Sequence, residues 1–275
     1  MQKEKVQKEK TQEEKMNSDT VEILWTGGYD SSFRICQLSK LPIKIKPYYL
    51  VGERLSKNKE LEAIENITKA LKTKPDTRCT FLDLEIVPKE ELEKIDHVTT
   101  AYKRIKEENK LGTQYEGLGW LAYKYPGVEL SVQKDGRIDA ILHKYKSIKR
   151  IECSTIGRYY KVDMEKAPEH VKGLFGNYHF PLIEYTKLKM KKEYIKLGCE
   201  DIIDMTWFCH KPIDGKVCGR CNPCKFVVEE GMKYRLSKEA LTNYKERMKK
   251  IRRKNMRKSK PWRALRKVKN FALGK

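Results

Sequence analysis

The stretch of residues 21–38 most constrains what this chain can fold into. It reads as an apolar strand over residues 21–25, then the adjacent glycines Gly27 and Gly28, then hydroxyl residues that open a helix. With no Cβ, both glycines let the backbone turn sharply and approach an anion closely. Unpaired N–H groups and the positive end of the helix dipole favour negative charge at such a helix start. The pattern predicts a phosphate-binding loop, with a plain turn and Asp30 as helix cap as the alternative.

This loop lacks two common nucleotide-binding patterns. G-x-x-x-x-G-K-[ST] is absent, so the loop has no lysine that grips the β and γ phosphates, and G-x-G-x-x-G is absent as well. Residues 26–31, TGGYDS, instead resemble the S-G-G-x-D-S signature of the PP-loop ATP pyrophosphatases, with Thr26 in place of the usual Ser. In that family the loop holds the β and γ phosphates as a pyrophosphate leaving group. The resemblance therefore implies attack at the α phosphate and an adenylated substrate.

Length and hydropathy place limits on the rest of the chain. Its 275 residues are enough for one large α/β domain and an appendage. No stretch approaches the ~20 apolar residues of a membrane span, so we expect no transmembrane segment. The N-terminal residues lack the apolar centre of a secretory signal, and residues 1–19 are expected to form a disordered extension. These features predict a cytoplasmic protein.

Positive charge is concentrated near the C-terminal end. The formal net charge is +22, and residues 245–275 hold fifteen Lys and Arg against Glu246 alone. Trp262, Leu265, Val268 and Phe271 recur there at near-helical spacing. A basic helical tail of this kind suits a nucleic acid, an anionic membrane surface or an acidic partner. A solvated tail that docks its few apolar residues on the body is the alternative.

Cysteine spacing supplies the second strong signal. Four cysteines occur singly and are expected to be small buried side chains: Cys36, Cys79, Cys153 and Cys199. The other four follow the pattern C-x8-C-x2-C-x2-C: Cys209, Cys218, Cys221 and Cys224. Four thiolates close a structural Zn²⁺ site, because no coordination position remains for substrate. An iron–sulfur cluster is the rival, since spacing alone does not identify the metal, and disulfides are disfavoured without export.

Strands and helices alternate along most of the chain. Strands are expected at 21–25, 45–51, 80–87, 128–132 and 180–184, and helices at 31–39, 60–71, 89–109, 114–125 and 187–197. Residues 133–173 show no clear pattern. The alternation predicts an α/β fold, a Rossmann-like parallel sheet flanked by helices with ligands at the carboxyl ends of its strands. We expect an ATP-binding domain over 20–204, a four-cysteine zinc module with a helix over 205–244, and a basic tail over 245–275.

A short element near the end of the expected ATP-binding domain belongs to the same chemistry. Pro181 and Leu182 are followed, after four further residues, by Lys187. This resembles the P-L-x4-K element of several PP-loop enzymes, where the lysine contacts the triphosphate. Lys187 would supply the cation that the glycine loop lacks. An ordinary surface lysine is the alternative in so lysine-rich a chain.

Taken in order, the glycine loop, the P-L-x4-K element and the cysteine cluster after Thr206 resemble 7-cyano-7-deazaguanine synthase over about residues 21–232. That family converts a 7-carboxy-7-deazaguanine to the amide with ammonia and then to the nitrile, each step driven by ATP. The resemblance implies Asp30, Ser31 and Lys187 as catalytic residues, Asp30 also as a Mg²⁺ ligand, and the four clustered cysteines as zinc ligands. It implies that ATP is bound by Thr26, Gly27, Gly28, Tyr29, Asp30, Ser31, Ser32 and Lys187, with Leu50, Val51 and Gly52 bordering the adenine.

The sequence departs from the family where the purine-like substrate should bind. The family's Gly-Arg-Asn appears here as Gly112-Thr113-Gln114, without the arginine. The resemblance therefore supports ATP-driven activation of a carboxylate more strongly than it supports a particular substrate. The substrate that it implies is a small 7-deazaguanine-like acid, with ammonia as the nitrogen donor. Two other functions stay open. One is a PP-loop enzyme that modifies tRNA, DNA or a protein through an adenylated intermediate and uses the basic tail to bind it. The other is a binding protein that retains the loop but has no enzymatic turnover. The oligomeric state also stays open, with a homodimer as one possibility.

Overall fold

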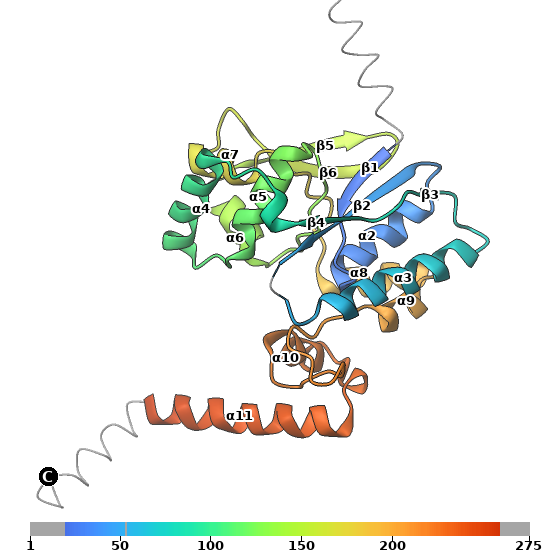
Figure 1. Cartoon of the computed structure of the whole chain (residues 1–275), viewed down its shortest axis with the longest axis vertical. Helices are drawn as coiled ribbons and strands as arrows, with labels where there is room; N and C mark the ends of the chain where they lie inside the picture. Colours follow the sequence, from blue (N-terminus) through green and yellow to red (C-terminus); the bar gives the residue numbers. More distant parts are fainter. Residues whose placement is uncertain (1–19, 53, 259–275) are drawn as a thin grey trace, which may run out of the picture. The chain divides into compact units, whose positions relative to one another are not determined.

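The computed structural model describes residues 20–52 and 54–258, and the chain divides into two compact units between Trp207 and Phe208. The first unit is a mixed α/β domain, and the second is a helical module that carries the clustered cysteines (Figure 1). The expected N-terminal extension, residue 53 and the part of the basic tail from 259 onward lie outside the described residues.

A parallel sheet forms the centre of the first unit. Strand β2 (Lys44–Val51) pairs with β1 (Thr20–Leu24) on one side and with β3 (Thr80–Phe81) and β4 (Glu85–Pro88) on the other. The register aligns Leu24 with Tyr48, and the backbone N–H of Trp25 continues the ladder to the Tyr48 carbonyl at 2.9 Å. Because the strands are parallel, β1 and β2 end at the same edge of the sheet.

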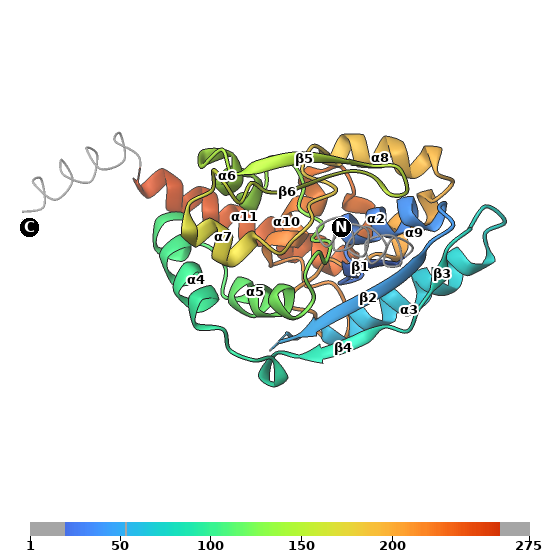
Figure 2. The same cartoon turned by 90° about the horizontal axis from the view of Figure 1, so that it is seen from above.

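Helices flank this sheet on both faces (Figures 1 and 2). Successive strand side chains point to opposite faces. On β2, Tyr48 and Leu50 join the hydrophobic core with α4, α5 and α7, whereas Tyr49 reaches Glu60 of α3 on the other face. The first group of helices packs together, as does the second. Their bounds are α4 (Asp96–Asn109), α5 (Gln114–Lys124) and α7 (Glu169–Phe175), and α2 (Tyr29–Ser39), α3 (Lys57–Thr73), α8 (Lys187–Lys196) and α9 (Glu200–Met205).

The single strand expected over residues 80–87 is wrong, because it is interrupted between β3 and β4. Phe81 pairs with Ile45 and Glu85 with Tyr48, so four steps along this segment oppose three along β2. One extra residue must be accommodated, as in a β-bulge, and the ladder breaks there. The helix expected over 89–109 is likewise divided, into a 3₁₀ turn η1 (Lys89–Glu91) and α4.

The strands expected over 128–132 and 180–184 are also wrong. Glu129 forms a single parallel bridge to Ile23 of β1 on one side and to His179 on the other. The segment then turns, with the Val132 N–H on the Leu130 carbonyl at 2.8 Å. Beyond Phe180, Pro181 has no N–H to donate, and the chain turns again. Residues 128–132 therefore pair at Glu129 only. Residues 180–184 pair at Phe180 only, and its partner is Tyr160 of the hairpin strand over residues 157–162.

Residues 133–173, which the sequence left unassigned, contain a helix and an antiparallel hairpin before α7. These are α6 (Arg137–Lys144), β5 (Ile148–Cys153) and β6 (Gly157–Val162). The hairpin strands are mostly exposed or half-buried, so their sequences lack the alternation of apolar and polar residues that marks a strand.

The second unit contains α10 (Asn222–Glu229), a 3₁₀ turn η2 (Lys233–Arg235) and the long helix α11 (Lys238–Lys258). Helix α11 runs without a break through residue 245, where the separate basic tail was expected to begin. Among the described helices, none has the length and apolar character needed to cross a bilayer.

Candidate functional site

The glycine loop follows β1 at the carboxyl edge of the sheet. Gly27 has φ +64°, and a Cβ there would lie 2.7 Å from the Glu60 carbonyl oxygen of α3. Only glycine fits this position, for both its backbone conformation and the close approach of α3. Gly28 has an ordinary φ of −83°, so the expectation that both glycines make the turn holds for Gly27 alone.

Helix α2 begins directly after this loop. Its N-cap is Gly28, with no side chain capping the helix, so the alternative in which Asp30 serves as the cap is wrong. Asp30 lies in the first turn. The Ser31 hydroxyl is 3.4 Å from the Gly28 carbonyl, and the buried Ser32 hydroxyl accepts a hydrogen bond from the Trp25 indole at 3.0 Å. Ser32 therefore fixes the loop to the strand that precedes it.

The side chains of Lys187 and Asp30 are in contact in the structure. The Lys187 ammonium donates to the Asp30 carboxylate and lies 4.5 Å from the centre of the Tyr29 ring. Lys187 is the first residue of α8, whose N-cap Thr186 accepts from the Lys189 backbone at 3.2 Å. The side chains are 26% exposed for Lys187 and 29% for Asp30. Both charges are therefore accessible to a ligand at the start of α2.

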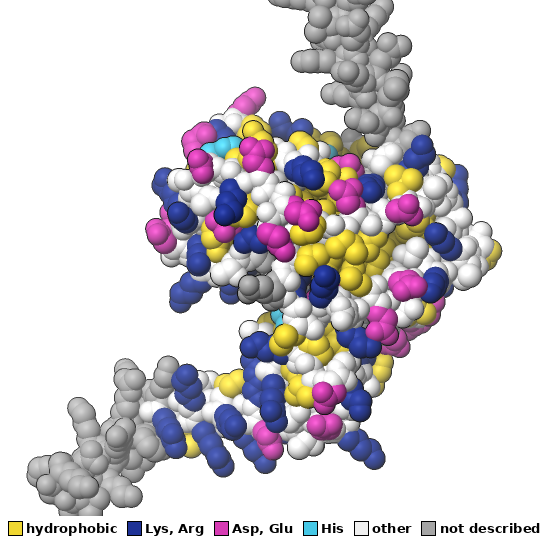
Figure 3. Space-filling model, viewed as in Figure 1, with side chains coloured by type: hydrophobic (Ala, Val, Ile, Leu, Met, Phe, Trp, Pro, Cys, Tyr) yellow, Lys and Arg dark blue, Asp and Glu magenta, His cyan; other side chains and the backbone are white. Residues whose placement is uncertain are grey.

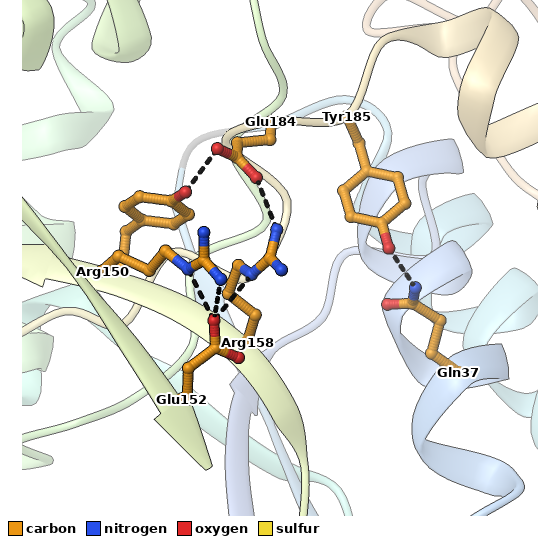
Figure 4. Close-up of polar contacts among 7 residues, drawn as sticks. Gln37, Arg150, Glu152, Arg158, Glu184 and Tyr185 are labelled. Carbon is orange, nitrogen blue, oxygen red and sulfur yellow. Dashed lines mark hydrogen bonds and ion pairs between the residues drawn. The ribbon is translucent and has the colours of Figure 1, made fainter.

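The segment that leads into Lys187 is held from two sides (Figure 4). On one side, Glu184 accepts from the Tyr160 hydroxyl and from Arg158 Nη1 at 3.2 Å, both on the β5–β6 hairpin. On the other side, the Tyr185 hydroxyl accepts from Gln37 Nε2 of α2 at 3.3 Å. These contacts bind the approach to α8 to the hairpin and to α2, and so they position Lys187.

Leu50 and Val51 end β2 beside the glycine loop, and Gly52 follows directly. Leu50 is buried, whereas Val51 and Gly52 are half-buried. Below them, the buried Glu60 carboxylate accepts from the Tyr49 hydroxyl at 2.7 Å and from Ser56 Oγ at 2.6 Å. Burial, and then the Glu60 charge, raises the pKa of Tyr49, so this network keeps a neutral phenol beneath the strand end.

Two polar side chains at this edge of the sheet were not predicted from the sequence as site residues. Ser131 Oγ and Gln133 Oε1 are buried atoms that find no hydrogen-bond partner among the described residues. They follow Glu129, which bridges to β1, so they lie at the same carboxyl edge as the glycine loop. Their position at the end of an expected strand was the signal that could have identified them.

The four clustered cysteines gather in the second unit. The sulfur atoms of Cys209, Cys218, Cys221 and Cys224 all lie within 4.8 Å of one another. The Sγ atoms of Cys218 and Cys224 are 3.9 Å apart, and those of Cys221 and Cys224 3.2 Å. Four sulfurs around Zn²⁺ at about 2.3 Å would be about 3.8 Å apart, so the cluster fits a metal ion such as zinc.

The backbone around the cysteines supports this cluster. Backbone N–H groups point at its sulfurs, from Cys218 to Cys209 Sγ at 3.3 Å and from Arg220 to Cys218 Sγ at 3.2 Å. Hydrogen bonding with Cys209 and Cys224 lowers the pKa of Cys221. Gly219 has φ +70°, and a Cβ there would overlap the Ala240 carbonyl of α11. Glycine at 219 therefore lets the backbone between Cys218 and Cys221 pass close to α11.

Comparison of the chain with protein-family models gave no match, and neither did comparison with curated protein sequences.

Proposed function

We propose that the first unit is a Rossmann-like PP-loop ATP pyrophosphatase, similar to 7-cyano-7-deazaguanine synthase, that activates a carboxylate with ATP for attack by ammonia. The contact between Lys187 and Asp30 carries the proposal. The resemblance to the PP-loop enzymes implies that both residues serve the triphosphate, although 157 positions separate them.

ATP would bind along the carboxyl edge of the sheet. The amides and hydroxyls of residues 26–32 would hold the β and γ phosphates, with Lys187 as the cation. The adenine would lie against Leu50, Val51 and Gly52 at the end of the neighbouring strand. Binding of the phosphates would divert the Lys187 ammonium from Asp30 and leave that carboxylate for a metal ion.

Asp30 suits Mg²⁺, which usually takes one or two carboxylates together with phosphate oxygens and waters. Its carboxylate is accessible and lies in the first turn of the helix that faces the phosphates. When bound, Mg²⁺ would neutralise charge on the phosphates. Lys187 would stabilise the pyrophosphate as its bond to the α phosphorus breaks, which is an electrostatic and positioning role.

The reaction follows from this arrangement. A carboxylate oxygen of the substrate attacks the α phosphorus, and the bond to the bridging oxygen of pyrophosphate breaks. Ammonia then attacks the acyl carbon, AMP leaves, and a proton is released from nitrogen to give the amide. A second ATP-driven step on the amide oxygen would remove it and give the nitrile. The 7-deazaguanine-like carboxylate is the substrate class implied by the resemblance.

The cysteine cluster would have a structural role in this enzyme. Four thiolates would complete the coordination of Zn²⁺ and leave no open position for substrate. The metal would therefore stabilise the fold of the second unit.

Product analysis tests the proposal. The protein is incubated with ATP, Mg²⁺, ammonium and 7-carboxy-7-deazaguanine, and the nucleotide and base products are identified by mass spectrometry. We expect AMP and pyrophosphate in equal amounts, formed only when the acid is present, together with its amide or nitrile. Formation of ADP and orthophosphate in place of AMP would reject the proposal.

A further inference from the structure

Helix α11 carries a dense band of cations that the proposed activity does not use. Over residues 245–257 it has eight Lys and Arg and a single acid, Glu246. Seven of the eight are exposed: Lys245, Lys249, Lys250, Arg252, Arg253, Lys254 and Arg257. Within the described part of the chain, no carboxylate forms an ion pair with any of these seven. Figure 3 shows Lys and Arg side chains along the helix.

The eighth cation explains how the helix is held. Arg247 donates from Nη1 to the Cys221 carbonyl at 2.8 Å, and Asn243 donates to the Cys218 carbonyl at 3.1 Å. Both carbonyls belong to the cysteine cluster. Helix α11 is therefore anchored to the module through these two side chains, while the seven exposed cations stay available to a partner.

The distribution of the charges indicates what kind of partner fits. At about 100° per residue, the seven exposed cations cover roughly 200° of the helix circumference over a length of about 20 Å. A partner must therefore present negative charge on more than one side of the helix. The two phosphate strands that border the major groove of duplex DNA do so, and this groove is wide enough for an α-helix.

Other polyanions fit less well. An interfacial membrane helix needs a broad apolar face, whereas here Met248 and Ile251 form a narrow, half-buried stripe and the exposed Met256 lies among the cations. Residues 245–257 contain no aromatic side chain on which the bases of a single strand could stack. The major groove of duplex RNA is deep and narrow, so an α-helix cannot lie in it between the two phosphate strands.

We infer that α11 binds the phosphate backbone of duplex DNA through its seven exposed cations, without dependence on base sequence. Each phosphate contact releases counterions, so the affinity should fall steeply with salt. Binding requires no ATP, and it is therefore independent of the proposed activity.

The experiment measures binding of the full chain to a fluorescent 20-base-pair DNA by anisotropy, over a range of salt concentrations. In the test variant, Lys249, Arg252, Arg253 and Lys254 are changed to Gln. Loss of four contacts should reduce the slope of log K against log salt by about 3.6 and weaken binding at least ~100-fold near 0.1 M salt. In the matched control, four exposed lysines of the first unit are changed to Gln: Lys72, Lys191, Lys192 and Lys196.

The control should change the slope by less than about 1. Circular dichroism verifies that each variant retains its helix content, and the milder pair Arg252→Gln and Arg253→Gln should give about half the slope change of the test variant. Equal losses in test and control variants would overturn the inference. So would tighter binding to single-stranded DNA, duplex RNA, poly-glutamate or phosphatidylserine vesicles than to the duplex.

Discussion

The guanidinium of Arg34 binds both carboxylate oxygens of Glu129, with Nε 2.8 Å from Oε2 and Nη2 2.7 Å from Oε1. The side chains are 5% and 1% exposed. Arg34 lies on α2, which starts at the glycine loop, and Glu129 bridges β1 and His179. The pair therefore connects the loop's helix to the segment on the far side of β1 from β2.

Removing one charge of this pair should destabilise the first unit. We expect Glu129→Gln to lower the free energy of unfolding by about 3 kcal/mol or more, because a buried guanidinium would lose its counter-charge. Glu65→Gln is the control: Glu65 pairs with Lys69 on the surface, and the change should leave the unfolding midpoint almost unchanged. Urea titrations of both variants make the comparison, and similar midpoints would contradict the assigned role of Glu129.

Lys187→Met should abolish most of the AMP-forming activity. Loss of the cation that stabilises the leaving pyrophosphate should lower kcat about 100-fold or more. Lys189→Met is the matched control on the same helix, since the Lys189 ammonium lies over the Tyr185 ring at 4.1 Å. Pyrophosphate release is measured for both variants, together with Asp30→Ala. Wild-type turnover by Lys187→Met or Asp30→Ala would remove the basis of the proposed function.

Two glycines allow the space around the glycine loop to be tested apart from its backbone angle. Gly27 and Gly198 have φ values of +64° and +62°, but a Cβ at Gly198 meets nothing within 4 Å. Gly198→Ala should cost about 1 kcal/mol for the left-handed conformation alone. Gly27→Ala should cost about 2 kcal/mol more, because its Cβ would collide with the Glu60 carbonyl. Chemical denaturation of the two variants measures this difference, and equal costs would show that the loop has room to move away from α3.

Metal content tests the cysteine cluster. Cys221→Ser should release the bound ion and lower the melting temperature of the purified protein, because the free energy of metal binding contributes to folding. Cys79→Ser, at a half-buried cysteine outside the cluster, should retain the metal. Elemental analysis by mass spectrometry distinguishes zinc from iron in the same samples. Full metal occupancy in Cys221→Ser would exclude this residue as a ligand.

The stability of the first unit should decrease in mild acid in part because of His179. Burial lowers the pKa of His179 below its usual 6.5. The unfolded chain then binds a proton more readily than the folded one, so stability is lost as the pH falls through about 6.5. His179→Asn should lose less stability between pH 7.5 and 5.5 than the wild type does, and the size of that difference measures the contribution of His179. Urea midpoints at the two pH values provide the measurement, and an unchanged dependence in His179→Asn would contradict it.

Local signals in the sequence were sufficient for the central strands and for the cysteine cluster. The mostly apolar residues before Gly27 predict β1, because a short apolar stretch that ends at a glycine turn is typical of a buried strand. The spacing of Cys218, Cys221 and Cys224 brings their sulfur atoms together within one short stretch, which ends in the first turn of α10. These features depend on residues close in sequence, and so a pattern is enough to predict them.

The tertiary structure alone decided the features that depend on long-range pairing. The extra residue between β3 and β4 is visible only against β2, and the two bridges at Glu129 depend on Ile23 and His179. Nothing in the sequence distinguishes Arg34 and Glu129 from other charged residues. Only the packing of the fold buries both side chains and pairs them with each other. In physical terms, the sequence by itself determined which backbone conformations and metal-ligand spacings are available locally, whereas burial and contacts between distant segments decided which charges pair and which strands persist.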